Sequence, residues 1–404
     1  MEDNLMKKIL IAVLLILATL MCISCGEEKI DTGNFTVEFD KKNNTATITG
    51  YTAKDENITI PEKFGKYTVT TIGRNAFKEN YDVSEIVFPA TLKTIEASAF
   101  ELCVSLKEVT LPSSLEKLGN TAFASCRKLE KVSIPSNVSE IGICAFTGCI
   151  ALDEITVDEA NAAYSSDIGG VLFNKDKTIL IQYPLGSSLV EYEIPEETTE
   201  ISSYAFEKAK KLESITAPSS LKTVGSYAFQ ASSVRKVKFE SVETIDNFAF
   251  NESKLQYAEL GNTLKKIGDS AFGWCTSLSN VNLPASVETI GTSAFYMCTA
   301  VDCYLVDKDN KNYATDEHGV LFNKDMTILL YYPNARELHE YTVPNTVTKI
   351  STRAFSPSLN LSKVTIPDSV EIIEEYAFAQ CANLKDVIYE GTQPQSIAEN
   401  AFEK

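Results

Sequence analysis

Cysteine is the residue type whose spacing in this sequence most invites a chemical interpretation. Six of the ten cysteines each follow a phenylalanine by three residues: Cys103, Cys126, Cys149, Cys275, Cys298 and Cys381. A metal site needs several ligands around one ion, but this register supplies one cysteine per unit of a repeat. We expect these thiols to pack as small hydrophobes, with disulfides between neighbouring units as the alternative. Cys144 and Cys303 lie off the register, and we expect each of them to be more reactive than the register cysteines.

Histidine and the acidic residues give catalysis little support. The only histidines are His318 and His339, and no nucleophile stands beside either. No phosphate-binding glycine loop and no H-E-x-x-H motif occurs. The segment 307–310 begins like a calcium loop, but Asn312 and His318 occupy the positions where Gly and Glu are required. We expect no enzyme activity, no catalytic residue, no cofactor and no metal site.

A row of solvent-facing side chains is the remaining candidate site. In short strands of the pattern Leu-x-x-Val-x-Ile-Pro the apolar residues point inward, so the residues flanking the central Val face solvent. Tyr257 is the main aromatic anchor of the row, and aromatic residues dominate binding hot spots. A charged row is equally what an ordinary solvated face looks like. The partner-binding candidates are Lys131, Lys236, Lys238, Tyr257, Asn280, Asn282 and Lys363.

These residues are positioned by a repeat marked by the dipeptide Ala-Phe. Most intervals are 21 to 24 residues, and two are 60. A fixed period in this range indicates a solenoid. One unit buries about seven large apolar side chains at ~1.5–3 kcal/mol each, against ~1.5 kcal/mol of ordering entropy per residue, so it is stable only when stacked. The marking phenylalanines are Phe77, Phe100, Phe123, Phe146, Phe206, Phe229, Phe250, Phe272, Phe295, Phe355, Phe378 and Phe402.

Each unit contains two predicted extended pieces and one turn. Leu-x-x-Val-x-Ile-Pro predicts a short strand that proline ends, and Val-x-x-Ile-Gly predicts a second extended piece. Small polar residues often precede Ala-Phe, where they suit a turn or a one-turn helix that carries Phe inward. They are Asn75, Ser98, Thr121, Ser270 and Ser293.

The full pattern, A-F-x-x-C-x-x-L-x-x-V-x-I-P-x-x-V-x-x-I-G, resembles the BspA-like class of bacterial leucine-rich repeats from about Phe35 to Lys404. The resemblance implies a right-handed leucine-rich repeat solenoid, mainly short parallel β-strands with one-turn helices, in about 12 repeats. It also implies a secreted or surface protein, some relatives being adhesins that bind host matrix proteins. Such a resemblance fixes the fold better than the partner.

Two segments depart from the regular repeat. Residues 35–72 alternate with period two around Asp40–Asn44, which predicts a β-hairpin and an N-terminal cap before the repeat domain, 73–404. The 60-residue intervals hold two β-hairpin insertions near 158–195 and 307–344, offset by 149 residues. The offset indicates duplication of a larger block. The hairpins either extend the sheet or present a tab to a partner.

The N-terminus carries an export signal. Lys7 and Lys8 precede an apolar run, 9–21, in the order expected of a secretory signal, so we interpret 1–24 as a lipoprotein-type signal peptide and 25–34 as a tether. Ser24 and Cys25 resemble a lipoprotein box, which makes Cys25 the lipidation site, although Leu is lacking three residues before it. Cleavage without lipidation and a membrane-spanning anchor are the alternatives.

The net charge of −18 argues against a nucleic-acid partner, which needs a basic footprint. We therefore predict an exported, lipid-anchored protein of the cell surface or outer membrane. It binds a protein ligand such as a host extracellular matrix or plasma protein, in the manner of an adhesin. The alternative is a structural or scaffold protein of the cell envelope.

Overall fold

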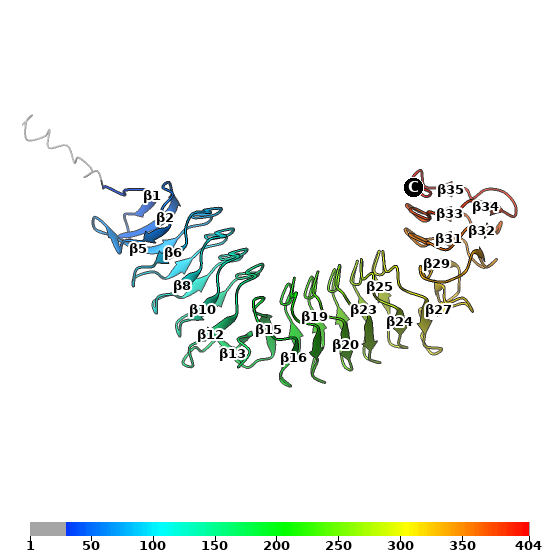
Figure 1. The fold of residues 1–404 in the computed structure, drawn as a ribbon, viewed down its shortest axis with the longest axis horizontal. Helices are drawn as coiled ribbons and strands as arrows, with labels where there is room; N and C mark the ends of the chain where they lie inside the picture. Colours follow the sequence, from blue (N-terminus) through cyan, green and yellow to red (C-terminus); the bar gives the residue numbers. More distant parts are fainter. Residues whose placement is uncertain (1–29, 404) are drawn as a thin grey trace, which may run out of the picture.

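Each unit of the repeat forms one coil of a curved stack (Figure 1). The computed structural model describes residues 30–403, so the predicted signal peptide, Cys25 and the first part of the tether lie outside the described residues. The apolar residues of the repeat point inward as predicted; Leu129, Val132 and Ile134 are all at most 2% exposed. All secondary structure in residues 30–403 is β-strand, and that range holds no helix able to span a membrane.

The outer strands, one per coil, come from the Leu-x-x-Val-x-Ile-Pro segments. Neighbouring outer strands pair in parallel and in register, with Val132 opposite Ile155. Most alternate exposed and buried residues, which confirms that the residues flanking the central position face solvent. They are β3 (Asn57–Thr59), β6 (Glu85–Val87), β8 (Glu108–Thr110), β10 (Lys131–Ile134), β12 (Glu154–Val157), β16 (Glu191–Glu193), β18 (Ser214–Thr216), β20 (Lys236–Phe239), β22 (Tyr257–Leu260), β24 (Asn280–Leu283), β26 (Cys303–Val306), β30 (Glu340–Thr342), β32 (Lys363–Ile366) and β34 (Asp386–Tyr389).

The short strands form a second parallel ladder, from the Val-x-x-Ile-Gly segments. Their glycine is required by close packing between coils: a Cβ on Gly119 would stand 2.4 Å from the backbone nitrogen of Ala97. In Figure 1, β31, β33 and β35 lie nearer the inside of the arc than β32 and β34 do. The short strands are β7 (Thr94–Ile95), β9 (Lys117–Leu118), β11 (Glu140–Ile141), β17 (Glu200–Ile201), β19 (Thr223–Val224), β21 (Thr244–Ile245), β23 (Lys266–Ile267), β25 (Thr289–Ile290), β31 (Lys349–Ile350), β33 (Ile372–Ile373) and β35 (Ser396–Ile397).

The Ala-Phe segments form a third ladder of turns, so the predicted one-turn helices are wrong. Phe100 N–H donates to the Ala122 carbonyl of the next coil (2.8 Å), whereas Glu101 N–H donates within its own coil to Ser98 (3.2 Å). This alternation needs left-handed residues two before and two after each Phe; Ser98 has φ 57° and Leu102 φ 63°. In a helix all of these amides would donate hydrogen bonds within their own coil. The turn instead sends every second amide to the next coil, which is why a ladder of turns forms in place of a helix. We call this side of the stack the turn face.

The predicted number of repeats is also wrong, because the stack has about 15 turns and not 12. The additional coils have tyrosine where the others have the marking phenylalanine, so the Ala-Phe pattern misses them. These tyrosines are Tyr51, Tyr183 and Tyr332, which join the stacked rings of the core at centroid distances of 5.7, 5.1 and 5.1 Å from Phe77, Phe206 and Phe355.

At the N-terminal end the parallel ladder finishes in an antiparallel hairpin. Strand β1 (Phe35–Asp40) pairs with β2 (Thr45–Tyr51) as predicted, and β2 then pairs in parallel with β5 (Tyr67–Ile72), against which the two-residue strand β4 (Lys63–Phe64) folds back. The hairpin thus covers the edge of β2 that would otherwise face solvent.

The two insertions interrupt the stack at equivalent places. Each forms three antiparallel strands, the last of which pairs in parallel with the next short strand, so the hairpins extend the sheet. The short-strand ladder ends at β11 and β25 before each insertion and restarts after it, and the core divides there into three clusters. Figure 1 shows the stack changing direction at both places. The strands are β13 (Tyr164–Ser166), β14 (Leu172–Asn174) and β15 (Ile179–Gln182), and β27 (Tyr313–Thr315), β28 (Leu321–Asn323) and β29 (Ile328–Tyr331).

Candidate binding surfaces

The row of predicted partner-binding residues lies on the outer strands, but the structure does not gather it into one site. Lys236 and Lys238 on β20 lie beside Tyr257 and Glu259 on β22. Asn280 and Asn282 follow on β24. Lys131 on β10 lies beyond the first insertion and Lys363 on β32 beyond the second, so the candidates form three separate groups along the arc.

Most of the lysines in this row are neutralised by neighbouring carboxylates. Lys131 pairs with Glu154 at 2.7 Å, Lys363 with Glu340 at 2.8 Å, and Lys238 with Glu240 at 2.9 Å. Exposed pairs of this kind contribute at most about 1 kcal/mol each to stability. This row is therefore largely a compensated charged surface, which attracts an acidic partner only weakly.

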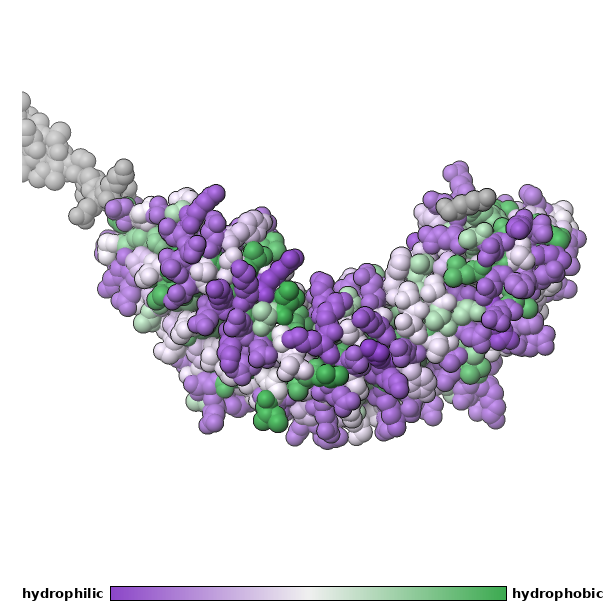
Figure 2. All heavy atoms as spheres, in the orientation of Figure 1, coloured by the Kyte–Doolittle hydropathy of each residue, from purple (hydrophilic) through white to green (hydrophobic). Residues whose placement is uncertain are grey.

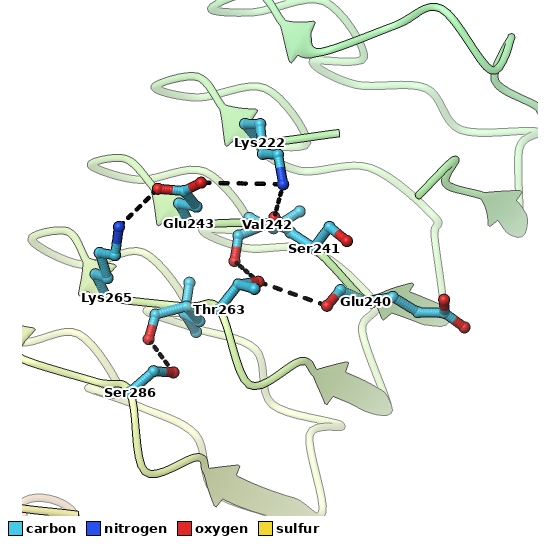
Figure 3. Close-up of polar contacts among 9 residues, drawn as sticks. Lys222, Glu240, Ser241, Val242, Glu243, Thr263, Lys265 and Ser286 are labelled. Atoms are coloured by element: carbon cyan, nitrogen blue, oxygen red, sulfur yellow. Dashed lines mark hydrogen bonds and ion pairs between the residues drawn. The ribbon is translucent and has the colours of Figure 1, made fainter. Parts of the chain in front are cut away.

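The charged residues beside the short strands are compensated in the same way. Figure 3 shows Glu243 between Lys222 (3.9 Å) and Lys265 (2.8 Å), which come from the coils before and after it. The hydrogen bond from Lys265 lowers the pKa of Glu243. In the same view Thr263 Oγ1 donates to the Val242 carbonyl of the preceding coil, at 3.1 Å. These rows join neighbouring coils and need no external ligand to explain them.

The cysteines of the repeat register are packing residues, five of them buried and Cys381 half-buried. All eight cysteines in residues 30–403 are free thiols, and each register thiol donates to the carbonyl of a phenylalanine in the preceding coil, for example Cys103 to Phe77 at 3.1 Å. Burial raises the pKa of Cys103 to about 12. Burial, with Glu207 nearby, raises the pKa of Cys144 to about 11. The greater reactivity expected of Cys144 and Cys303 remains a prediction.

The histidines and the acidic loop do not converge on a catalytic or metal site. His318 Nε2 lies 3.8 Å from Glu317, and His339 Nδ1 lies 3.0 Å from the Asn360 carbonyl. The loop at Asp307 closes on itself, because Asp307 accepts a hydrogen bond from the Asp309 amide (2.9 Å). Within the described part of the chain, no three His, Cys, Asp or Glu residues are grouped so as to hold a metal ion.

The turn face carries a stripe of aromatic side chains that sequence reasoning missed. Tyr204, Tyr227 and Phe248 stack on one another with centroids 4.8 Å apart, and Trp274, 45% exposed, contacts Tyr296 edge-on in the coils that follow. We call these five residues the aromatic stripe. In Figure 1 the last Ala-Phe turn, next to the C-terminus, lies on the inner side of the arc. The stripe therefore belongs to the side of the stack that faces into the arc.

A signal for the stripe was present in the sequence. Tyr204, Tyr227 and Phe248 occupy the position two before the marking Phe, where most other units carry Ser, Thr or Asn and three carry Cys144, Arg353 and Tyr376. Tyr204, Tyr227 and Phe248 have left-handed backbone, with φ of 64°, 60° and 58°, a conformation that bulky residues rarely adopt. The ladder of turns imposes that conformation, and small polar residues fit it more easily. The aromatic residues there have no role in forming the turn.

The first junction is the gap between the coils of Phe146 and Tyr183, where the first insertion interrupts the ladders. It contains a cavity of about 490 Å³ lined by apolar residues, among them Ile141, Ile143, Phe146 and Ile181, and by a smaller group of polar ones. The polar residues are Asn174, Gln182, Glu200, Ser202 and Ser203. Cavities of this size and character are typical of ligand sites.

The second junction is the equivalent gap between the coils of Phe295 and Tyr332, and it is smaller. Its cavity measures about 200 Å³, because the Tyr331 ring lies against Phe295 (centroids 5.6 Å apart) and its hydroxyl accepts a hydrogen bond from Ala294 N–H at 2.9 Å. Arg353 bridges the gap on the turn face, with its guanidinium over the rings of Tyr296 (4.6 Å) and Tyr376 (5.0 Å).

Exposed apolar residues also distinguish the first junction from the second. Ile143 and Ile150 in the coil before the first insertion are 67% and 53% exposed, and Ile168 and Val190 within it are 111% and 53% exposed. The residues 149 positions later are Thr292, Thr299, Glu317 and His339. Figure 2 shows a mostly hydrophilic surface on this side of the molecule, with hydrophobic patches near β15 and β16.

A comparison with curated proteins found no match to the chain. Among solved structures, a leucine rich cell surface protein from Faecalibacterium prausnitzii is 22% identical, covers 90% of this chain and 95% of its own, and has a TM-score of 0.33. The pneumococcal vaccine antigen PcpA is 21% identical, with 92% and 98% covered and a TM-score of 0.48. A leucine-rich repeat protein from Bacteroides ovatus is 21% identical, with 90% and 100% covered and a TM-score of 0.40.

The family model of the BspA type leucine rich repeat region matches six copies, over residues 51–179, 185–302 and 331–404. The two gaps between these ranges fall in the two insertions, where the ladders of the structure are interrupted. The matched ranges cover most of the chain and coincide with the coils described above. The chain therefore belongs to the family of BspA-type leucine-rich repeat proteins.

Proposed function

We propose that the protein is exported to the cell surface, anchored there by lipid on Cys25, and binds other proteins through the turn face of its arc, as an adhesin for a host extracellular matrix or plasma protein. The aromatic stripe carries this proposal. Aromatic side chains are over-represented among the residues that dominate binding energy, and here five of them lie on consecutive coils, with Trp274 45% exposed and the other four half-buried. The family relationship and the export signal in the sequence support a surface location.

The outer row is the weaker candidate for the binding surface. Its lysines are already paired with Glu154, Glu240 and Glu340, so a partner would have to displace carboxylates before gaining any contact. We include no catalytic activity, cofactor or metal in the proposal, since the contacts of the two histidines are to Glu317 and to the Asn360 carbonyl and bring no nucleophile or metal ligand set beside either. A nucleic-acid partner would be repelled by the charge of −18.

The binding proposal is tested by solid-phase binding of residues 26–404 to fibronectin, fibrinogen and isolated envelope components. The decisive variant changes Tyr227 and Phe248 together to Ser, the residue found at the same position in three other coils, as Ser98, Ser270 and Ser293. The matched control changes Lys236 and Lys238 to Glu on the outer strands. We expect saturable, salt-tolerant binding to one host protein, weakened about tenfold or more by the stripe variant and unchanged by the control.

Two outcomes would redirect the proposal. Loss of binding in the outer-strand variant alone would return the site to the row of lysines. Binding only to envelope components would identify a structural or scaffold protein of the envelope in place of an adhesin.

The lipid anchor is tested separately by replacing Cys25 with Ser. The full-length protein should partition into the detergent phase of a Triton X-114 extraction and incorporate labelled palmitate, because two or more acyl chains bind a bilayer firmly. The Cys25→Ser variant should do neither. Retention of the variant in the detergent phase would favour the uncleaved apolar segment as the anchor.

A further inference from the structure

The first junction leaves two backbone amides without an acceptor. In regular coils the amides of the marking Phe and of the residue two before it donate to carbonyls of the next coil; Phe123 donates to Ala145 (2.8 Å) and Thr121 to Ile143 (2.9 Å). The equivalent amides at the first junction belong to Phe146 and Cys144, and neither donates to any acceptor within residues 30–403. Both residues line the cavity, and Cys144 has the same left-handed φ, 60°, as its counterparts.

The direction of these amides follows from the ladder. Every turn before the junction sends the same two amides toward the next coil, and Cys144 and Phe146 share its conformation, so their N–H groups point into the cavity. An unpaired amide in an apolar cavity costs about 1–3 kcal/mol. An occupant that offers two acceptors at this spacing would recover that free energy.

The second junction shows what fills such a gap when the chain fills it itself. There the amides of Ser293 and Phe295 likewise find no carbonyl of a next coil within residues 30–403, but the Tyr331 ring occupies the space and its hydroxyl accepts from the neighbouring Ala294 N–H. At the first junction the equivalent residue is Gln182, whose side-chain amide is turned away to the carbonyls of Tyr183 (2.9 Å) and Ala205 (3.3 Å). An occupant of the first junction must therefore bring both an apolar body and oxygen acceptors.

We propose that the first junction binds an extended segment of a partner polypeptide, which places a large apolar side chain in the cavity and presents main-chain carbonyls to the amides of Cys144 and Phe146. In every regular coil the acceptors of these amides are carbonyls two residues apart, such as those of Ala122 and Asn120. An extended peptide presents carbonyls on one side with the same two-residue interval. Ile143, 67% exposed at the cavity, adds an apolar contact for the entering chain.

The chemistry of the lining favours an internal peptide segment over a free carboxylate. No Lys or Arg lines the cavity, and Glu200 does. An anion would therefore be repelled there, whereas a neutral carbonyl is not. A basic residue beside the apolar anchor of the peptide would gain from Glu200 and from the overall negative charge.

The inference deepens the proposed function, because it gives the protein partner a defined contact, and it is tested independently of any host protein. The probe is a library of linear twelve-residue peptides displayed on phage, selected on purified residues 26–404. Selected sequences are then synthesised with an amidated C-terminus, and their affinity is measured by fluorescence anisotropy. We expect a recurrent large apolar residue in the selected peptides.

Two variants copy the second junction into the first. Gln182→Tyr fills the cavity with the side chain that the equivalent coil already accommodates, and Ile143→Thr changes only an exposed residue, so at least one should fold normally by its thermal unfolding curve. Each should weaken the amidated peptide about tenfold or more. The matched control, Thr110→Tyr on the exposed side of β8, should leave the affinity unchanged.

Three results would overturn the inference. Unchanged affinity in folded Gln182→Tyr and Ile143→Thr would place the peptide elsewhere. Binding that requires a free C-terminal carboxylate would identify an anion site. Selection of no peptide, together with displacement of the dye 1-anilinonaphthalene-8-sulfonate by Gln182→Tyr, would identify a cavity for small apolar molecules. The two proposals can fail separately. If Gln182→Tyr and Ile143→Thr lose the peptide but still bind a host protein through the aromatic stripe, the host-protein site and the peptide site are distinct. If no host protein binds through the stripe while the peptide result holds, only the adhesin proposal is contradicted.

Discussion

The two junctions share the contacts that hold their insertions and differ in the residues around the gap. In both, a tyrosine hydroxyl caps the last short strand: Tyr164 accepts from Ile141 N–H (2.8 Å) and Tyr313 from Ile290 N–H (2.9 Å). In both, an asparagine side chain ties the insertion to the preceding coil, Asn161 to the Pro135 carbonyl (2.7 Å) and Asn310 to the Pro284 carbonyl (2.8 Å). The hairpins are therefore fixed to the stack in the same way.

Several of the residues that differ line the cavity or lie on the turn face. The second gap is filled by Tyr331 and bridged by Arg353, whereas the first is hollow and is crossed on the turn face by the hydrogen bond from Thr147 Oγ1 to Glu207 (3.4 Å). The contacts that hold the insertions are the same at both junctions, so these differences are not needed to attach the hairpins. They are Gln182 for Tyr331, Cys144 for Ser293, Ile143 for Thr292, Thr147 for Tyr296 and Tyr204 for Arg353. The two junctions therefore share one mode of attaching their insertions. They differ in that the second gap is filled by the chain itself, whereas the first is hollow and has room for an external occupant.

The largest effect should follow from making the second junction hollow. Tyr331→Gln removes a ring that is 7% exposed and packs on Phe295 and Tyr304, so we expect the free energy of unfolding to fall by about 2–4 kcal/mol. Urea unfolding followed by the fluorescence of the single tryptophan, Trp274, measures it, because that residue lies in the core block next to this junction. A fall of less than about 0.5 kcal/mol would mean that the ring does not hold the gap together.

The reverse exchange should have the opposite sign and a smaller size. Gln182→Tyr fills the first cavity and gives Ala145 N–H an acceptor equivalent to that of Ala294, so stability should rise by about 0.5–2 kcal/mol. The same urea measurement applies, with Thr110→Tyr as the control for adding a ring at an exposed site. A clear loss of stability would show that the first gap has a different shape from the second, which would break the comparison.

Much of the fold follows from the sequence, because the same pattern of apolar residues occurs in twelve copies. Inward Leu, Val and Ile, the parallel strands, the N-terminal hairpin and the packed cysteines all follow from residue type and period. Two expectations failed for identifiable reasons. A one-turn helix and a turn with alternating left-handed residues share the same small polar residues before Ala-Phe, and only the hydrogen bonds to the next coil decide between them. The coils with Tyr51, Tyr183 and Tyr332 were missing from the predicted number of repeats because that number came from the Ala-Phe dipeptide, and these coils have Tyr in place of Phe.

The binding surfaces were less accessible to sequence reasoning. The outer row was correctly placed in solvent, but a lysine and its compensating glutamate stand about one repeat apart in sequence, as Lys131 and Glu154 do, so the neutralisation appears only when the coils are stacked. The aromatic stripe could have been found by comparing one register position across all units. The cavity could not, because it arises where two ladders end and depends on how far the insertion holds them apart.

A finer test of the comparison uses two adjacent tyrosines of the second junction. The Tyr331 hydroxyl accepts a hydrogen bond from Ala294 N–H, whereas the buried Tyr332 hydroxyl has no hydrogen-bond partner. Tyr331→Phe should therefore cost about 0.5–1.5 kcal/mol, and Tyr332→Phe should be neutral or slightly stabilising. Each variant is the control for the other in the same urea series. Equal effects would mean that the hydrogen bond from Ala294 N–H to Tyr331 contributes no stability. The argument that the unpaired amides of the first junction favour an occupant would then fail.

The smallest expected effect concerns pH. Glu374 lines the second cavity, and the residue 149 positions earlier is Gly225. Burial alone would raise the pKa of Glu374, but hydrogen bonds from Lys349 and Thr352 outweigh it and lower the pKa below its usual 4.5. A carboxylate with a lowered folded-state pKa stabilises the protein above the pKa of its unfolded state, and that stabilisation is lost as the pH falls through the folded pKa. Acidification from pH 6 to pH 3.5 should therefore loosen the second junction more than the first.

Hydrogen–deuterium exchange distinguishes the two junctions, because it reports local opening. Peptides covering β31 and β33 should gain exchange on acidification, beyond the change in intrinsic amide exchange rate, more than peptides covering β17 and β19 do. Glu374→Gln should remove most of that difference by raising exchange at β31 and β33 already at pH 6, since the neutral amide keeps the shape of the side chain but loses the charge that pairs with Lys349 (2.9 Å). If the variant retains the acid response, other carboxylates cause it, and the second junction owes its closure to the Tyr331 ring and to Arg353 without help from this ion pair.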